Sequence, residues 1–339
     1  MSVKPSGKRV FSGIQPTGIP HLGNYLGAIQ YWVDIQQDNE CIYCLVDMHA
    51  LTVWQEPVSL RKQTLEQTAV LLAAGIDPNK HILFNQSAVS AHARLAWIFN
   101  CVARIGWMNR MTQFKDKAGK NREANSVGLY VYPNLMAADI LAYRATCVPV
   151  GEDQRQHLEL TNDIAQKFNH DYKTDFFPVV EGFIPKISAR VMNLRDGSKK
   201  MSKSDPSEQG RIELLDEDDV ITNKIKRAKS DSEHLPSEQE GLSHRLEALN
   251  LVSIYSVLAK QSIEQVLQDF GGKGFSPFKS ALSDLLIQKI APIREETKKL
   301  LADKQYLQTI LKEGAEKASA IADPIVSEAE YIVGFLNKE

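Results

Sequence analysis

Short apolar runs alternate with helical patterns along the chain up to about residue 195. The runs 9–14, 41–46, 81–84 and 146–150 have the length and apolar content of buried strands. Apolar residues at helical spacing lie between them. We expect helices over 22–33, from Pro57 to just before Gly75, and over about 154–169. Strands that alternate with helices favour an α/β domain built on a mainly parallel sheet.

The strand signals end at about residue 205, and helical patterns follow. Acidic residues at 216–219 precede basic residues at 224–229, an order that suits the dipole of a helix, and a basic helix that faces RNA is the alternative interpretation. Helical patterns then continue from Pro277 almost to the end, with breaks expected at Pro292 and Pro324. A chain of 339 residues is long enough for two domains. We therefore predict an α/β domain over 1–205 and a small all-helical domain over 206–339.

The composition is that of a soluble globular protein, with 43% hydrophobic and 24% charged residues. No apolar stretch reaches the roughly 18 residues of a membrane span, so we expect no membrane partner. The 40 basic and 42 acidic residues give a formal net charge of −2, which leaves only a local basic patch for a nucleic-acid partner. The four cysteines are too few for a disulfide framework and indicate a reducing compartment.

Two features of the sequence bear on metal binding and on location. Cys41 and Cys44 form a lone CxxC pair inside a predicted buried strand, and no second pair completes a zinc site, so we expect no dedicated metal site. Basic residues at 4, 8 and 9 with no acid before residue 34 give a faint resemblance to an organelle-targeting segment. Because the first strand begins by residue 10, we interpret the start as that of a cytoplasmic protein.

The first candidate site is a glycine- and proline-rich turn that leads from a strand into a helix. Residues 13–24 read Gly-Ile-Gln-Pro-Thr-Gly-Ile-Pro-His-Leu-Gly-Asn. Glycines let the backbone approach a ligand closely, and the free N–H groups of a helix start attract anions. His21 and Asn24 lie at that helix start, where both can donate hydrogen bonds to a phosphate. Taken alone, such a turn is more often a simple connection than a nucleotide site.

The second candidate site is Lys-Lys-Met-Ser-Lys-Ser at 199–204, in a predicted loop after the Asp196-Gly197 turn. Two lysines and two hydroxyls on a loop suit a polyphosphate whose charge shifts during a reaction. Most runs of this composition are solvated basic loops. The pentapeptide at 200–204, however, arises by chance in only about one in ten thousand chains of this size.

The third candidate site is Gly-Glu-Asp-Gln-Arg-Gln-His at 151–157, directly after a predicted strand. Acids at a strand end hold ribose hydroxyls in dinucleotide folds, although Glu152 and Asp153 are equally suited to cap the next helix. Ligands bind beyond the carboxyl ends of parallel strands. We therefore expect residues 13–18 and 151–153 to meet at one rim of the sheet.

Together and in this order, the three stretches resemble the class I aminoacyl-tRNA synthetases. Residues 21–24, His-Leu-Gly-Asn, are similar to that family's HIGH signature, with Asn24 where many members have His, and Lys-Met-Ser-Lys-Ser at 200–204 matches its second signature. The closer resemblance is to the bacterial-type tryptophanyl-tRNA synthetases. It rests on Phe-Ser-Gly-Ile-Gln-Pro-Thr-Gly (11–18), Val-Asp-Met-His-Ala-Leu-Thr (46–52), Met-Thr-Gln-Phe-Lys (111–115), Leu-Met-Ala-Ala-Asp (135–139) and Val-Gly-Glu-Asp-Gln (150–154).

The resemblance implies a Rossmann-like catalytic domain that binds ATP and tryptophan, followed by a helical region that binds the tRNA anticodon. It implies two steps: L-tryptophan and ATP give tryptophanyl-adenylate and pyrophosphate, and tryptophan then passes to the 3′-terminal ribose of tRNA(Trp). Catalysis would consist of positioning and electrostatic stabilisation, without a covalent enzyme intermediate. The implied partners are ATP, which carries Mg²⁺, tryptophan, tRNA(Trp) and a second copy of the chain in a homodimer.

The resemblance also assigns residues to the ATP site. The ATP-binding residues would be Gln15, Pro16, Thr17, Gly23, Asn24, Gly151, Glu152, Asp153, Val191, Lys200, Met201, Ser202, Lys203 and Ser204. The catalytic residues would be His21, Asn24, Lys200, Lys203 and Ser204. Of these, Lys203 is expected to matter most for the rate, and Val191 is expected to meet the adenine.

For the amino acid, the resemblance implies that Asp139 accepts a hydrogen bond from the indole N–H. Asp139 follows an apolar run, so we expect a mostly apolar pocket. An unpaired carboxylate in such a pocket is costly, and a ligand without that N–H would leave it unsatisfied. Sites of this kind reject such ligands by roughly ten-thousand-fold. The other family-matched pocket residues are Phe11, Val46, His49, Tyr132, Met136 and Gln154.

Three other interpretations stay open on the sequence alone. A nucleotidylyltransferase that never contacts RNA would explain the first motif but leave the second motif and the helical region unused. A catalytically inactive RNA-binding relative is disfavoured by the intact signatures at 21–24 and 200–204. A tyrosyl-type synthetase shares the architecture and also uses an acid toward its substrate. Residues 11–17 and 151–154 favour tryptophan over tyrosine.

Overall fold

The computed structural model of the chain describes residues 6–111, 125–151, 154–183, 190–203 and 205–336. Five parallel strands form the central sheet in the order β3-β2-β1-β4-β5. The strands are β1 (Arg9–Ile14), β2 (Glu40–Leu45), β3 (Ile82–Asn85), β4 (Cys147–Pro149) and β5 (Glu181–Phe183). The predicted parallel sheet and its four predicted strands are confirmed. The sequence did not predict β5, because its short span carries two exposed residues and no apolar run.

The order of the strands reverses between β1 and β4, and a reversal of this kind opens a crevice for ligands in an α/β sheet. β1 pairs with β2 along all six of its residues, whereas it pairs with β4 at Val10 and Cys147. The carboxyl ends of β1 and β4 are therefore free to separate. The crevice between them is where the first and third candidate sites meet.

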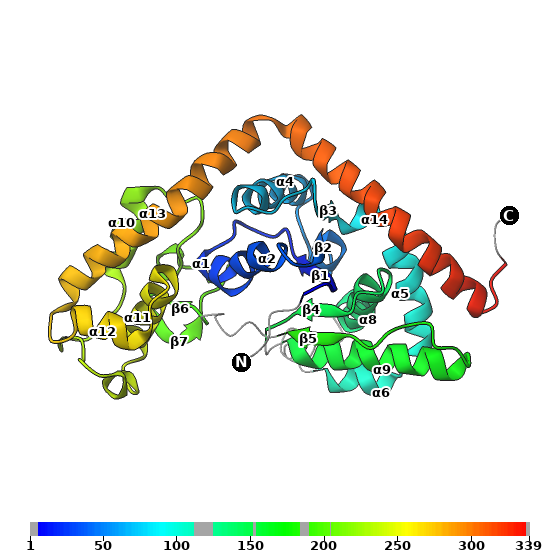
Figure 1. The fold of residues 1–339 in the computed structure, drawn as a ribbon, viewed down its shortest axis with the longest axis horizontal. Coiled ribbons are helices and arrows are strands. Elements are labelled where there is room, and N and C mark those ends of the chain that lie inside the picture. The colour runs from blue at the N-terminus through cyan, green and yellow to red at the C-terminus, as the bar shows by residue number, and fades with distance from the viewer. Residues whose placement is uncertain (1–5, 112–124, 152–153, 184–189, 204, 337–339) are drawn as a thin grey trace.

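Helices cover both faces of the sheet (Figure 1). One face packs on a continuous helical segment and on α4 (Pro57–Ala73). That segment consists of α1 (Leu22–Asn24), a π-helical turn (Tyr25–Ile29) and α2 (Gln30–Ile35). The other face packs on α5 (Ala91–Val102), α8 (Val127–Leu141) and α9 (Arg155–Asp171). The short helices α3 (Asp47–Ala50) and α6 (Ile105–Arg110) and a 3-10 turn (Gln86–Ala88) complete this part.

A second unit follows the sheet, and its buried core also includes Leu22, Leu26 and Val70 from the helices of the first unit. It begins with an antiparallel hairpin of β6 (Met192–Asn193) and β7 (Asp196–Lys200). The loop predicted over 199–204 is wrong for Lys199 and Lys200, which lie in β7, whereas residues 201–203 lie outside helices and strands. The polar residues of β7 give no apolar signal for a strand. The helices of this unit are α10 (Asp218–Arg227), α11 (Leu246–Ala259), α12 (Ile263–Phe270) and the first part of α13 (Phe275–Ala302). Two 3-10 turns, Glu208–Gly210 and Gln239–Leu242, connect them.

The last two helices, α13 and α14 (Lys304–Ile332), form an arch over the molecule, and α14 returns to the sheet (Figure 1). A Cβ atom on Gly314 of α14 would lie 1.9 Å from the Leu83 carbonyl oxygen of β3. The Arg94 Nε on α5 donates to Glu330 at 2.8 Å. The boundary at residue 205 stays a prediction, but α14 supplies core residues to the sheet that precedes it. None of the described helices is long and apolar enough to cross a membrane.

The predicted breaks at Pro292 and Pro324 are wrong, because α13 and α14 continue through both prolines and meet at Asp303. A proline inside a helix removes one hydrogen bond and clashes with the preceding turn, at a cost of about 3 kcal/mol. Buried residues on either side, such as Ile290 and Ile293 around Pro292, supply compensating contacts. Local sequence indicates the cost of the proline, whereas only the tertiary packing offsets it.

Candidate functional site

A cavity of about 340 Å³ opens where β1 and β4 separate. It falls within the range of roughly 300–1,000 Å³ typical of small-molecule sites. All of the residues predicted for the amino acid line it: Phe11, Val46, His49, Tyr132, Met136, Asp139 and Gln154. Gln15 and Gly151 line the same cavity, so the first and third stretches meet at one rim as predicted. The predicted Glu152 and Asp153 lie outside the described residues.

The helix α8 places three of these side chains in the cavity. Tyr132, Met136 and Asp139 follow one another at spacings of four and three residues, which puts them on one face of a helix. The ring of His49, from α3, stands edge-on to the ring of Tyr132. The Tyr132 hydroxyl lies 2.8 Å from Nε2 of the buried His157 on α9. Burial raises the pKa of Tyr132 to about 12, so its hydroxyl keeps its proton at neutral pH.

Asp139 is buried and bonded by three side chains. Its Oδ2 lies 2.7 Å from His49 Nε2, and its Oδ1 lies 2.7 Å from His92 Nδ1. Gln86 Nε2 donates to Oδ1 at 2.6 Å. Burial by itself would raise the pKa of Asp139, but the charges and hydrogen bonds of the two histidines outweigh burial and hold the pKa below its ordinary value. The side chain is therefore ionised at neutral pH.

The expectation that the Asp139 carboxylate is unpaired without a ligand is wrong. Gln86, His92 and Tyr143, whose hydroxyl bonds His92, were missed because nothing in their local sequence marks them. They come from a turn after β3, from α5 and from the turn that follows α8. Only folding brings them to one carboxylate. Selection of a ligand with an indole N–H therefore depends on an acceptor position of the Asp139 carboxylate that these side chains leave open. It does not depend on an unpaired charge.

The first signature forms a tight polar turn at the start of α1. The Asn24 amide donates to His21 Nδ1 at 3.3 Å, and the His21 amide donates to Asn24 Oδ1 at 3.1 Å. A Cβ on Gly23 would lie 2.9 Å from the His21 ring, so glycine is required for this packing. Burial, and then the charges of Lys203, Arg211 and Lys200, lower the pKa of His21 to about 4. His21 is therefore neutral at pH 7, with its proton on Nε2 because Nδ1 accepts.

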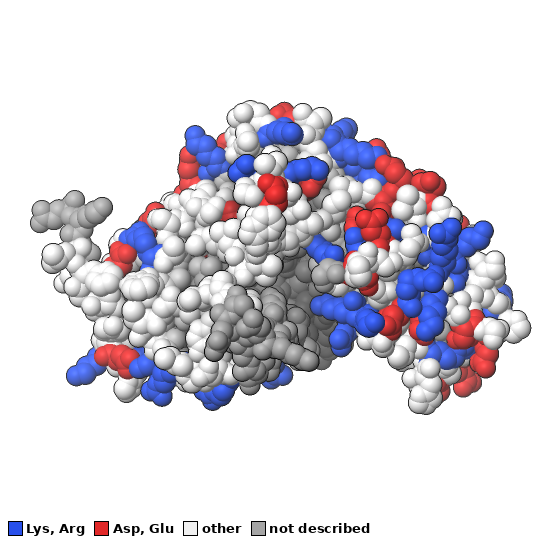
Figure 2. All heavy atoms as spheres, turned by 180° about the vertical axis from the view of Figure 1, so that it is seen from behind, with Lys and Arg blue, Asp and Glu red and all other residues white. Residues whose placement is uncertain are grey.

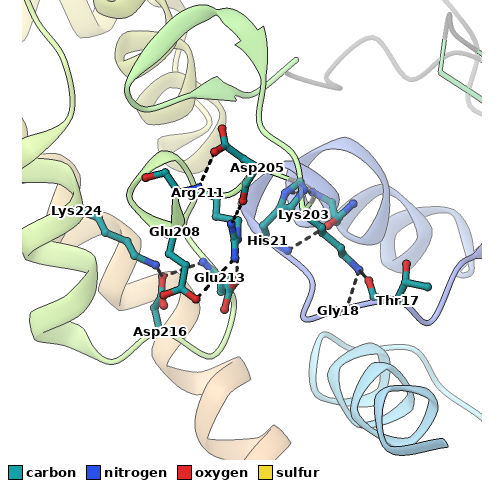
Figure 3. A network of polar contacts seen from close by, with 12 residues as sticks. Thr17, Gly18, His21, Lys203, Asp205, Glu208, Arg211, Glu213, Asp216 and Lys224 are labelled. Atoms are coloured by element: carbon teal, nitrogen blue, oxygen red, sulfur yellow. Dashed lines mark hydrogen bonds and ion pairs between the residues drawn. The ribbon is translucent and has the colours of Figure 1, made fainter. Parts of the chain in front are cut away.

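The second signature reaches the turn just before the first signature through Lys203. Its Nζ donates to the Thr17 carbonyl at 2.7 Å and to the Gly18 carbonyl at 3.0 Å (Figure 3). Gly18 has a φ of +66°, which turns the backbone in a way that favours glycine. Burial lowers the pKa of Lys203 to about 8, although the nearby charge of Glu213 opposes this shift. Lys203 and Thr17, which are 186 residues apart in the sequence, thus lie at one corner of the molecule.

A polar network supports this corner from behind (Figure 3). The Arg211 Nε donates to Glu213 at 2.8 Å, and its Nη1 donates to the Asp205 carbonyl at 2.9 Å, just after the second signature. Glu213 pairs with His21 as an isolated β-bridge. The segment after the second signature is therefore tied to the first signature through its backbone. Arg211 was missed because its role depends on partners at both ends of this segment.

The other predicted ATP-site residues have different surroundings. Lys200 is exposed on β7, Ser202 is half-buried, and Ser204 lies outside the described residues. Val191 and Met201 are buried in the second core beside Leu22, and the Val191 carbonyl accepts from the Met201 amide at 3.0 Å. Pro16 is buried in the turn. In the described parts of the chain, no group of three or more His, Cys, Asp or Glu side chains is placed to hold a metal ion.

Comparison with known proteins agrees with this geometry. The family described as tRNA synthetases class I (W and Y) matches residues 6–288. The chain is 57% identical to a tryptophan–tRNA ligase of Brucella melitensis, with 96% of this chain and 98% of that protein covered. It is 54% identical to a tryptophan–tRNA ligase of Caulobacter vibrioides, with 96% and 95% covered.

Solved structures of this family share the fold. Tryptophanyl-tRNA synthetase from Mycoplasma pneumoniae superposes with a TM-score of 0.87 at 31% identity, covering 97% of this chain and 98% of that one. The enzyme from Campylobacter jejuni, complexed with ADP and tryptophan, superposes with a TM-score of 0.81 at 32% identity, covering 96% and 100%. With both signatures at one corner and Asp139 in the adjoining cavity, the chain belongs to the tryptophan–tRNA ligases, within the class I tRNA synthetases.

Proposed function

We propose that the chain joins L-tryptophan to ATP in the cavity between β1 and β4, and then transfers tryptophan to the 3′-terminal ribose of tRNA(Trp). The observation that carries this proposal is that the cavity lined by Asp139 adjoins the turn bonded by Lys203. Asp139 lines a cavity whose rim holds Gln15 and Gly151, while Lys203 bonds the turn that follows Gln15. One ligand with an aromatic end and a phosphate end can therefore reach both regions.

The indole lies in the cavity, and Asp139 accepts a hydrogen bond from its N–H. Phe11, Val46 and Met136 supply apolar wall, and the other lining residues are largely apolar as well. His49 and Tyr132 bring polar atoms to the same wall, and Gln154 lies at the rim next to Gly151. The amino and carboxylate groups of tryptophan then point toward the rim, where the phosphates of ATP arrive.

ATP occupies the corner between the two signatures as its magnesium complex. Gln15, Thr17, Gly23 and Asn24 approach its phosphates and ribose, and Gly151 and Asp153 hold the adenosine ribose. Glu152 belongs to the same stretch as Asp153, and Pro16 shapes the turn. Val191 meets the adenine, Met201 and Ser202 belong to the same ATP site, and Lys200, Lys203 and Ser204 bind the pyrophosphate as it leaves.

In the first step the tryptophan carboxylate attacks the α-phosphorus, an oxygen–phosphorus bond forms, and the bond to the leaving pyrophosphate breaks. Negative charge grows on the pyrophosphate as it leaves. The Lys203 ammonium, which already lies at the turn, stabilises that charge. His21 is neutral, so its Nε2–H donates a hydrogen bond to a phosphate of ATP and adds no positive charge. In the second step a hydroxyl of the terminal ribose attacks the carbonyl carbon of the adenylate, and AMP leaves.

The tRNA contacts the helical part of the chain. Figure 2 shows many Lys and Arg side chains, with acidic side chains among them, at one end of the molecule, although the net charge is −2. Lys226 and Arg227 are exposed at the end of α10, whereas Lys224 is buried and bonded to Asp216 at 2.6 Å. A local basic surface of this kind attracts the phosphates of RNA without a large net charge.

The chain forms a homodimer in the cytoplasm. Several large apolar side chains are exposed near the ends of α3, α6 and α8: Leu51, Val53, Trp54, Ile105 and Val127. Trp54 is 81% exposed. The Ser126 hydroxyl donates to the Thr52 carbonyl at 3.2 Å, so the loop after α3 touches the start of α8. Exposed apolar patches commonly mark protein–protein interfaces, and a second copy would cover this one.

The test is ATP–pyrophosphate exchange measured with each of the twenty amino acids, followed by charging of a tRNA(Trp) transcript. Exchange that depends on tryptophan, with charging of that tRNA, is the expected result. Exchange that prefers tyrosine would favour the tyrosyl-type alternative. AMP release that ignores added tRNA would favour a nucleotidylyltransferase. Absence of any exchange would overturn the proposal.

A further inference from the structure

Behind Asp139 lies a buried chain of hydrogen bonds that the proposed reaction does not use. His92 is 0% exposed. Its Nδ1 lies 2.7 Å from Asp139 Oδ1, and its Nε2 lies 2.8 Å from the hydroxyl oxygen of Tyr143. Tyr143 in turn stacks on Phe11, a wall residue of the cavity, at 5.7 Å between ring centroids. Neither His92 nor Tyr143 is among the described residues that line the cavity.

The two oxygens of the Asp139 carboxylate accept hydrogen bonds from different partners. Oδ1 accepts from both Gln86 and His92, which uses the two lone pairs in the plane of the carboxylate. In the part of the chain that the structure describes, Oδ2 accepts one side-chain bond, from His49. One acceptor position therefore remains on Oδ2, and His49 is itself a wall residue of the cavity. A ligand N–H can use that position.

The direction of each bond in the chain follows from chemistry. An ionised carboxylate only accepts, so the proton on His92 Nδ1 faces Asp139. Burial raises the pKa of the Tyr143 hydroxyl above its ordinary value, so the hydroxyl keeps its proton; it donates to Nε2 of a neutral His92 ring and accepts from Nε2 of a charged one. The His92 ring is held at both nitrogens. Rotation of the ring would break both bonds and leave buried polar atoms without partners.

We infer that His92, held by Tyr143, is a positioning residue for indole recognition: it fixes the Asp139 carboxylate so that Oδ2 meets the indole N–H. This inference rests on the proposed function, because it concerns the same pocket. It separates two roles that a buried polar cluster can have. A merely structural His92 would affect stability, whereas a positioning His92 affects the choice between ligands with and without the N–H.

Two variants of His92 form a matched pair. His92→Asn places an amide nitrogen close to the position of Nδ1, so it retains the donor to Asp139 and loses the bond to Tyr143. His92→Gln places its amide nearer to the position of Nε2, so it retains a partner for Tyr143 and loses the donor to Asp139. Tyr143→Phe removes the hydroxyl that bonds His92 Nε2 and leaves the His92 side chain itself unchanged.

The measurement is ATP–pyrophosphate exchange with tryptophan and with an analogue in which sulfur replaces the indole N–H. For His92→Gln, the KM for tryptophan should rise about ten- to hundredfold, because a hydrogen bond to a charged group is lost and Asp139 is misplaced. The KM for ATP and for the analogue should change less than about twofold. His92→Asn should restore most of the preference for tryptophan, and Tyr143→Phe should reduce it by a smaller factor.

Each outcome decides between the alternatives. Unchanged preference in His92→Gln, with exchange in the parent enzyme intact, would overturn the positioning role and leave the proposed function standing. Equal losses for tryptophan and the analogue would assign His92 a structural role. If His92→Gln does not fold, Tyr143→Phe decides the question instead, since it deletes a single oxygen atom: an unchanged preference for tryptophan would then overturn the positioning role. Absence of tryptophan-dependent exchange in the parent enzyme would overturn the proposed function, and with it this inference.

Discussion

Replacing Lys203 with alanine should slow amino-acid activation and leave the affinity for tryptophan almost unchanged. The Lys203 ammonium donates to the Thr17 and Gly18 carbonyls at 2.7 and 3.0 Å, so it lies beside the turn where we expect the phosphates of ATP. Its charge is needed most when pyrophosphate leaves. Removal of one such donor commonly costs about 10²–10³ in kcat, or roughly 2.7–4 kcal/mol of transition-state stabilisation.

The pH dependence gives a second test of the same residue. Burial lowers the pKa of Lys203 to about 8, so the free enzyme loses this positive charge as the pH rises through about 8. The kcat/KM for ATP reports the free enzyme and should fall on that alkaline side. Lys203→Arg keeps its charge at these pH values, so the alkaline fall should move to higher pH in this variant.

The assay is ATP–pyrophosphate exchange at saturating and limiting tryptophan, from pH 6 to pH 10. Lys199→Ala serves as the matched control, because Lys199 is exposed and its Nζ pairs with Asp196 at 2.9 Å on the neighbouring hairpin. The control should retain the parental rate. A raised KM for tryptophan with a normal kcat in Lys203→Ala would refute the reasoning, and so would an equal loss in the control.

Four further changes have defined outcomes. Asp139→Ala should raise the Kd for tryptophan far more than that for ATP in equilibrium dialysis; equal losses would contradict its role. Gly314→Ala should lower the free energy of unfolding by about 1–3 kcal/mol, because its Cβ would lie 1.9 Å from a carbonyl oxygen of β3, whereas Gly106→Ala, with open space around it, should not destabilise the fold. Arg211→Ala should lower kcat by untying the second signature, and Arg211→Lys should not restore it, since an ammonium lacks the guanidinium fork. Trp54→Glu should shift a dimer toward monomer in sedimentation; an unchanged mass would place the interface elsewhere.

Local pattern was sufficient for four strands of the central sheet and for the helices that begin at Leu22, at Pro57 and near Gln154. The strands 9–14 and 81–84 each carry an apolar run bounded by turn residues, and such a run needs burial wherever it lies. The helix from Pro57 begins with a proline at its first position, where the missing N–H has no partner to lose. The polar strand β7 and the helices that continue through Pro292 and Pro324 depend instead on their neighbours, so local pattern misjudged them.

The site divides in the same way. The motifs at 21–24 and 200–204 predicted that a turn and a lysine segment act on one ligand, and the contact of Lys203 with Thr17 is consistent with that prediction. The seven residues predicted for tryptophan line one cavity, although their role stays a prediction. Gln86 and His92 were not predicted, since a buried glutamine or histidine looks the same in the sequence whether or not it bonds a carboxylate.

The sequence by itself determined the alternation of strands and helices, the family signatures and the acid that lies among apolar residues. These are properties of neighbouring residues, and the spacing of side chains along a strand or helix transmits them directly. The tertiary structure alone decided that Asp139 has three partners, that Lys203 lies at the turn, and that α14 returns to the sheet. Each of these depends on distances between segments far apart in the chain, and those distances are fixed only when the whole core packs.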